Sequence, residues 1–190
     1  MDLITKMAAA VGGAATGPGV YADEVFSADI YSGNESSQSI TNGVNLSENG
    51  GAVIIKNLTS SLSGVIADSG NGTGKVLQTD NTSSGLTTSS GVSSFNNNGF
   101  SLNTTSSLVN NDSSTYISYS LKKQEKFFDV VTYSGTGSTQ NISHNLNAVP
   151  KMIWFRRTDT GGEWAVYHDQ IGNSNYLRLS ETSTSASNTT

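Results

Sequence analysis

The sequence predicts an all-β protein of two tandem β-sandwich modules, the second incomplete, behind an extended N-terminal segment. Two observations carry this prediction. Only 13% of the 190 residues are charged and 34% are hydrophobic, a composition typical of many short strands joined by polar turns. The chain also contains an internal repeat with a period of about 100 residues, which suits one sandwich per copy and is too long for a solenoid.

The repeat is clearest between residues 26–46 and 128–146. Both stretches contain Tyr-Ser-Gly, beginning at Tyr31 and at Tyr133, and a Gln and an Ile follow at the same spacing. Later apolar runs continue the match with small gaps. We align 53–55 with 152–154, 65–68 with 166–169 and 76–78 with 176–178. This alignment places His168 opposite Ala67, so it predicts no role for that histidine that both copies share.

The repeat defines the expected domain boundaries. The N-terminal segment covers residues 1–24, the first module 25–122, a linker 123–126 and the second module 127–190. The second copy stops just after its match to 76–78, so it would lack the last strands of a sandwich and expose open edges. We therefore expect the chain to be the front part of a longer protein.

Hydrophobic patterning predicts the strands at the start of each copy. Phe26, Ala28 and Ile30 alternate with polar residues, as in a half-buried strand, and residues 38–44 are expected to form the returning arm of a hairpin. Residues 53–55 and 152–155 are continuous apolar runs, which predict central strands buried on both faces.

Two further strands close the first module. Asn98-Gly99 precedes Phe100 and favours a tight hairpin turn, because both residues tolerate a positive φ. In residues 117–121, apolar residues alternate with Ser118 and Ser120. This pattern predicts a strand whose serine face is wet.

No set of residues points to catalysis, a metal or a cofactor. Cysteine is absent, and the only histidines, His144 and His168, lack the Cys, Asp or Glu partners of a metal site. We expect His144 to cap a turn, Trp154 to lie in the core, and Trp164, which follows two glycines, to be the one candidate ligand contact. The chain is therefore expected not to be an enzyme.

Charge and hydropathy exclude two classes of partner. The net charge of −5 disfavours nucleic acid, because an acidic chain gains nothing from counterion release. No run approaches the roughly 18 apolar residues of a membrane span, so membrane insertion is not expected.

The N-terminal segment is predicted to dock on another protein. Its apolar residues are too few for a core of their own, and the glycines between them let the chain bend. The expected contact residues are Leu3, Ile4, Met7 and Val11 at near-helical spacing, followed by Val20 and Tyr21. The alternative is a frayed terminus without contacts.

The order of the motifs resembles a module common in virion structural proteins of marine and cyanobacterial phages. The motifs are FSADIYSGN, SITNGVNL, GGAVIIKN, VLQTDNT, SSFNNNGFSL and STYISYSLKK in the first copy, and FFDVVTYSGTG, ISHNLNAVP and WAVYHDQIGNSNYLRLS in the second. The resemblance covers about residues 21–190. It implies lectin-like, jelly-roll β-sandwich modules in a tail fibre or other appendage.

The same resemblance implies partners and a location. It places the protein in the tail of the virion, as a homotrimer attached through its N-terminus to other virion proteins, such as a tail adaptor, a nozzle or portal-proximal proteins. Distal parts of such a fibre would contact a host surface glycan. A head-attached fibre or capsid decoration protein is an alternative, and a secreted bacterial adhesin or lectin is another. A depolymerase is a further one, with its catalytic domain beyond Thr190.

Overall fold

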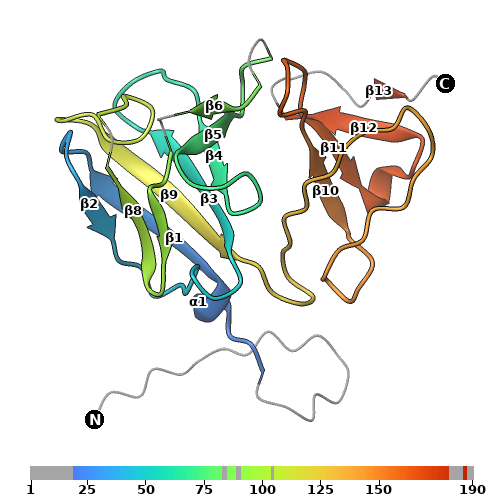
Figure 1. Cartoon of the computed structure of the whole chain (residues 1–190), viewed down its shortest axis with the longest axis horizontal. Helices are drawn as coiled ribbons and strands as arrows, with labels where there is room; N and C mark the ends of the chain where they lie inside the picture. The colour runs from blue at the N-terminus through green and yellow to red at the C-terminus, as the bar shows by residue number, and fades with distance from the viewer. Residues whose placement is uncertain (1–18, 83–84, 89–90, 104, 180–185, 188–190) are drawn as a thin grey trace.

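A computed structural model describes residues 19–82, 85–88, 91–103, 105–179 and 186–187 (Figure 1). The fold is nearly all β, with 36% of residues in strands and 4% in helices, as expected. The elements of the first copy are α1 (Ala22–Val25), β1 (Phe26–Ser32), β2 (Gln38–Ile40), β3 (Gly51–Asn57), β4 (Val65–Asp68), β5 (Lys75–Gln78), β6 (Thr87–Thr88), β7 (Ser94–Asn96), β8 (Gly99–Leu102) and β9 (Thr115–Lys122). Those of the second are β10 (Met152–Phe155), β11 (Ala165–His168), η1 (Asp169–Ile171), β12 (Asn175–Arg178) and β13 (Ala186–Ser187).

The first module is a sandwich of two antiparallel sheets. The larger has the strand order β1-β9-β3-β4-β5-β6 and the smaller has the order β2-β8-β7. The two sheets face each other, and the β10–β13 sheet of the second module lies beside them (Figure 1). Within the described residues, no helix is both long and apolar enough to cross a membrane.

The core between the two sheets centres on three aromatic rings. Tyr31 of β1 stacks on Tyr116 of β9 with 5.2 Å between ring centroids, and its edge meets Phe100 of β8 at 6.3 Å. The Tyr31 hydroxyl donates to the Val109 carbonyl at 2.7 Å, which satisfies a buried polar group. Burial, together with the neighbouring Tyr116 phenol, raises the pKa of Tyr31, so this hydroxyl stays protonated.

The strands β3, β4 and β5 are buried on both faces. On the inner face Val53, Ile55 and Val65 pack into the sandwich core, and on the outer face Ile66 and Leu77 pack into a second cluster. The prediction of double burial is therefore confirmed for residues 53–55. The outer cluster also contains residues of the second module, so the second face is buried by domain packing.

The predicted hairpin of residues 26–46 is wrong. β1 pairs with β9 in the large sheet, whereas β2 pairs with β8 in the small one, so the chain crosses between sheets after Ser32. Gln38 spans the crossing, because its side-chain amide donates to the Ser32 carbonyl at 3.2 Å. Gln140 makes the equivalent bond to Ser134 at 3.3 Å in the second copy.

The β7–β8 hairpin forms where it was predicted, with a small difference in its turn. Phe95 pairs with Phe100 and Asn96 with Gly99, so the two turn residues are 97 and 98, one position earlier than expected. Gly99 has a φ of +108°, and a Cβ there would lie 2.0 Å from the Ile40 carbonyl oxygen. Both the backbone conformation and the close approach of β2 require glycine.

The alternation predicted for β1 and β9 is present, but the faces are opposite to those expected. Ser118 and Ser120 of β9 are fully buried, and Asn42 donates a side-chain hydrogen bond to Ser120 at 2.8 Å. Phe26 and Ile30 of β1 are instead exposed, Ile30 to 69%. Apart from the core rings of Tyr31 and Tyr116, the inward-facing side chains of these two strands are small and polar, so the apolar rows point outward.

The second copy repeats the strands β3 to β6 as β10 to β13. Paired residues differ by 100 in number: Ala52–Asp68 matches Met152–His168, and Ile66–Leu77 matches Val166–Leu177. This register corrects the sequence alignment, which was displaced by one residue at two of the strands. His168 is therefore equivalent to Asp68 and not to Ala67.

Residues 128–134 and 140–142 are not strands, although their equivalents are β1 and β2. In the first copy, β1 pairs with β9 and β2 pairs with β8. Within residues 127–179, no strand is equivalent to β8 or β9, so these pairings are missing. The inner face of the second module is consequently open, and Phe155 is exposed where the equivalent Ile55 is buried. The prediction that residues 152–155 are buried on both faces is wrong for this reason.

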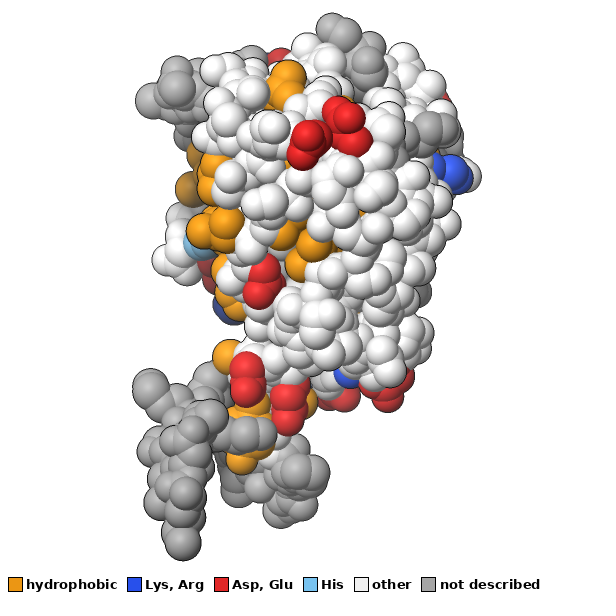
Figure 2. All heavy atoms as spheres, turned by 90° about the vertical axis from the view of Figure 1, so that its left-hand side faces the viewer, with side chains coloured by type: hydrophobic (Ala, Val, Ile, Leu, Met, Phe, Trp, Pro, Cys, Tyr) orange, Lys and Arg blue, Asp and Glu red, His pale blue; other side chains and the backbone are white. Residues whose placement is uncertain are grey.

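The surface of the first module is mostly uncharged. On the side away from the second module, Figure 2 shows white backbone and neutral polar side chains over most of the face, with scattered acidic groups and few basic ones. Ser, Thr and Asn therefore supply most of the polar surface of this module in place of charged groups.

The aromatic centre should dominate the stability of the first module. We expect Phe100→Ala to lower the free energy of unfolding by about 3–5 kcal/mol, because it leaves a cavity beside Tyr31 in a fully buried site. Leu58→Ala, at an exposed position, should change it by less than about 0.5 kcal/mol. Urea denaturation followed by circular dichroism measures both, and similar losses would contradict the assignment.

Candidate functional site

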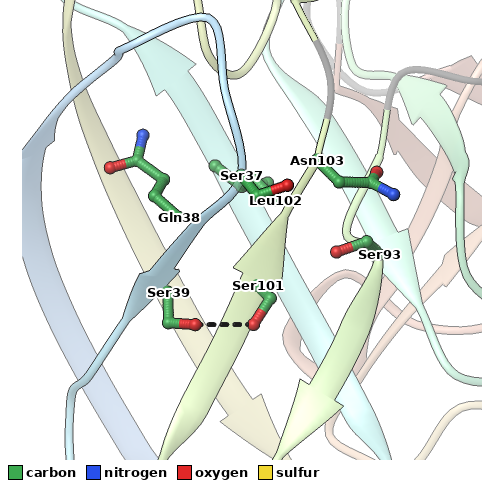
Figure 3. Close-up of a pocket in the computed structure, with 7 residues that line it drawn as sticks. All are labelled: Ser37, Gln38, Ser39, Ser93, Ser101, Leu102 and Asn103. Atoms are coloured by element: carbon green, nitrogen blue, oxygen red, sulfur yellow. Dashed lines mark hydrogen bonds between the residues drawn. The ribbon is translucent and has the colours of Figure 1, made fainter.

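The small sheet carries a shallow groove of about 400 Å³ (Figure 3). Its lining is polar and uncharged apart from one leucine: Ser37, Gln38, Ser39, Ser93, Ser101, Leu102 and Asn103. Ser39 and Ser101 face each other across β2 and β8, and their hydroxyl oxygens are 2.9 Å apart. Asn96 donates to the same Ser101 hydroxyl at 2.8 Å, so the serines of this face already bond to their neighbours.

The groove has the chemistry of a hydrated surface or of a weak site for neutral polyhydroxylated ligands. None of its seven lining residues is a base that could activate a serine. Gln38 is engaged by Ser32 and Asn110, and no aromatic ring offers a stacking platform in the groove. The hydroxyl and amide groups of this arrangement can exchange hydrogen bonds with a ligand or with water.

The two histidines both cap loops. His144 Nδ1 accepts the Leu146 backbone N–H at 3.3 Å, which confirms the capping role expected for it. His168 Nδ1 accepts the Gln170 N–H at 3.2 Å, and its equivalent Asp68 accepts the Asn71 N–H at 2.8 Å. The expectation that His168 has no role common to both copies is therefore wrong. In the part of the chain that the structure describes, no three His, Asp or Glu side chains cluster as metal ligands would.

The interface between the two modules contains an apolar cluster built from residues of both. Trp164 lies on the outer face of the large sheet, packed with Ala52, Ile66 and Leu77, and Phe128 and Val130 pack against the same cluster. The repeat register places Trp164 opposite Gly64, because Leu179 donates to the Trp164 carbonyl as Thr79 donates to that of Gly64. A large aromatic has thus taken the place of a glycine where the two modules meet.

The two tryptophans have exchanged the environments predicted for them. Trp164, the candidate ligand contact, is only 6% exposed and its indole N–H donates to the Gln78 carbonyl at 2.8 Å. Trp154, expected in the core, is 38% exposed and meets the Trp164 ring edge-on at 6.4 Å. A ligand could contact Trp164 only if the modules separated.

Backbone hydrogen bonds extend the interface along the loop after β5. Leu86 donates to the Thr158 carbonyl at 3.1 Å, and Gly162 donates to the Thr82 carbonyl at 2.7 Å. The Arg156 guanidinium donates to the Asn81 carbonyl at 2.7 Å. These three bonds join the loop after β5 to the segment between β10 and β11, beside the apolar cluster.

An ion pair stabilises the turn that links the two modules. The buried carboxylate of Asp129 lies 3.0 Å from the Lys123 ammonium, and it accepts the backbone N–H groups of Asn145 at 2.7 Å and Val130 at 2.9 Å. Burial alone would raise the pKa of Asp129, but these backbone and ammonium donors outweigh it and hold that pKa below its ordinary value.

The residues proposed for attachment are only partly described. Leu3, Ile4, Met7 and Val11 lie outside the described residues. Val20 is exposed and Tyr21 is half-buried just before α1, where the Tyr21 N–H donates to the Glu24 carboxylate at 3.2 Å. The described end of the segment therefore leads into α1, of which Tyr21 is the N-cap.

Comparison with known proteins identifies one family. Residues 21–190 match a family described as "Domain of unknown function (DUF7483)". The chain belongs to this family. No curated protein and no solved structure matches the chain. The family match spans both copies of the repeat and starts at Tyr21, just before α1.

The interface residues could have been found only in part from sequence. The continuous apolar runs indicated double burial, but they did not say that the outer face is covered by the second module. Asp129 and Lys123 carried no signal, because their pairing depends on a turn in which Gln124 and Phe128 bond to each other through their backbones.

Trp164 should be the main contributor to the interface. We expect Trp164→Ala to cost about 3–5 kcal/mol, because it empties a buried aromatic site and leaves the Gln78 carbonyl without this donor. Trp154→Ala is the matched control and should cost less than half as much, since that ring is partly exposed. Urea unfolding followed by far-ultraviolet circular dichroism measures both, and equal losses would argue against the assignment.

Asp129 should make the stability depend on pH. Its pKa is lower in the folded than in the unfolded state, so its stabilising contribution is fully present above about pH 5. It is lost as pH falls from there through the folded pKa. Between pH 5 and pH 2 we expect Asp129→Asn to lose less stability than the wild type. Glu48→Gln, in a surface pair with Lys122, should follow the wild type, and a wild-type curve parallel to that of Asp129→Asn would refute the role.

Proposed function

We propose that this chain is a non-catalytic structural protein of a phage virion, the virion-proximal part of a tail fibre that links the particle to distal receptor-binding domains. The observation that carries the proposal is the interface around Trp164, in which an apolar cluster and backbone hydrogen bonds join the two modules. Such an interface suits a spacer that must keep its length and direction under load.

The polar chemistry of the chain supports a structural role. His144 and His168 each accept a backbone N–H, and Asp129 accepts two such bonds and an ion pair. These imidazole and carboxylate groups hold loops through their hydrogen bonds to the backbone. The motifs that resemble virion proteins of marine and cyanobacterial phages supply the specific assignment.

Attachment to the particle is assigned to the N-terminal segment, through the six residues Leu3, Ile4, Met7, Val11, Val20 and Tyr21. A short segment that orders on binding holds its partner weakly. Three copies in a homotrimer would gain avidity through their high effective concentration. The partners would be other virion proteins at the tail, such as an adaptor, nozzle or portal-proximal protein.

Immunoelectron microscopy tests the proposal. Antibodies raised against residues 25–190 should label the tails of purified particles of the phage that encodes this chain, and mass spectrometry should find the chain in those particles. Labelling of the capsid would favour the alternative of a head-attached fibre or decoration protein. Particles free of the protein, with the protein at a bacterial surface, would refute the proposal and favour the adhesin alternative.

A further inference from the structure

The outer face of β1 is an apolar surface that the described part of the chain leaves exposed. We call Phe26, Ala28 and Ile30 the β1 face. All three are exposed, Phe26 to 40% and Ile30 to 69%. Their register partners on β9 extend the apolar surface: Leu121, Tyr119 and Ile117. A contiguous apolar surface of this kind is typical of interaction sites.

The repeat shows what a β1 face packs against. The equivalents of Phe26, Ala28 and Ile30 in the second copy are Phe128, Val130 and Thr132. Phe128 and Val130 pack on the outer face of β3–β5, and Gly70 makes room for the contact, since a Cβ there would lie 3.0 Å from Val130 Cγ1 and 3.2 Å from Thr132 Cγ2. Inside one chain, then, the residues equivalent to the β1 face, although they do not form a strand, lie on the outer face of another module.

The receiving surface also has a copy that is less covered. In the first module the receiving row is Ile54, Ile66 and Leu77, which are neighbours across β3, β4 and β5. The equivalent row in the second module, which we call the second row, is Trp154, Val166 and Leu177. The centre of this row, Val166, is buried at 5% exposure, like its equivalent Ile66 at 8%. The ends of the row are open, because Trp154 and Leu177 are each 38% exposed, whereas Leu77 is 4% exposed. Met152, next to Trp154 on the same face, is 51% exposed and accepts its indole N–H.

We propose that the β1 face of one copy of this chain binds the second row of another copy. The contact repeats between chains the packing that joins the two modules within one. One feature differs: Gly64 stands where the second copy has Trp164, so the aromatic group at the contact comes from Trp154 of the receiving chain. This deepens the proposed function, because it rests on the proposed homotrimer and assigns the surfaces that form it.

The contact is head-to-tail, since it uses two different surfaces of each chain. A head-to-tail contact closes into a ring if the rotation between copies permits and otherwise extends as a filament. The proposed homotrimer corresponds to a closed ring. In a head-to-tail contact, each of the two surfaces can be disrupted by a separate mutation. An interface of one surface with itself does not allow this.

Light scattering coupled to size exclusion, with the full chain, tests the contact. The wild type should associate, and Ile30→Asp and Met152→Asp should each weaken association at least about tenfold, because each places a charge in an apolar contact. An equimolar mixture of the two variants should form a one-to-one complex. Ile30→Asp keeps an intact second row and Met152→Asp keeps an intact β1 face, so one contact can form and no more.

Tyr133→Asp is the matched control, at an apolar position that is 53% exposed and belongs to neither surface, and it should associate like the wild type. Circular dichroism confirms that each variant is folded. A monomeric wild type, or a mixture without complex, would overturn the proposal. So would association lost in Ile30→Asp alone, which indicates β1 edges pairing with each other. Immunolabelling of particles does not depend on these outcomes, so the proposed function can stand or fall separately.

Discussion

The outer face of β3–β5 is the constraint on which the rest of the structure depends. A sheet apolar on both faces needs two covers, and the small sheet supplies only one of them. The second cover is the following module, anchored by Trp164 and aligned by backbone hydrogen bonds from Leu86 and Gly162. The two copies are therefore joined through packing, and the short linker only has to bring them together.

The repeat explains both the likeness and the inequality of the two modules. Hydrogen bonds that stabilise loops recur in both copies. Gln38 and Gln140 make equivalent bonds, and Asp68 and His168 cap equivalent loops. Sheet elements recur only where their partners are present. Residues 128–134 have the sequence pattern of β1, but pairing with β9 is what makes β1 a strand. Loop hydrogen bonds therefore recur wherever the sequence repeats, whereas a strand forms only where a neighbouring strand can pair with it.

The same logic connects the interior of the chain with its proposed assembly. Apart from the buried rings of Tyr31 and Tyr116, β1 and β9 place small polar side chains inside and an apolar row outside, which stays exposed in an isolated sandwich. The second copy covers its equivalent residues against the first module. Because the modules within one chain pack in this way, the exposed β1 face of the first module can serve as a surface for packing a second copy of the chain. A fibre is one assembly that such packing can produce.

The sequence by itself determined the all-β class, the repeat, the β7–β8 hairpin, the apolar runs of β3 and the capping role of His144. These follow from side-chain periodicity and local turn chemistry, which act within a few residues. Only the tertiary structure decided which face of β1 and β9 is buried, which sheet β2 joins, and which tryptophan is buried. Alternation marks two faces of a strand but not which one meets the core. Trp164 is buried by a sheet that precedes it by about 100 residues, and no local pattern reports that contact.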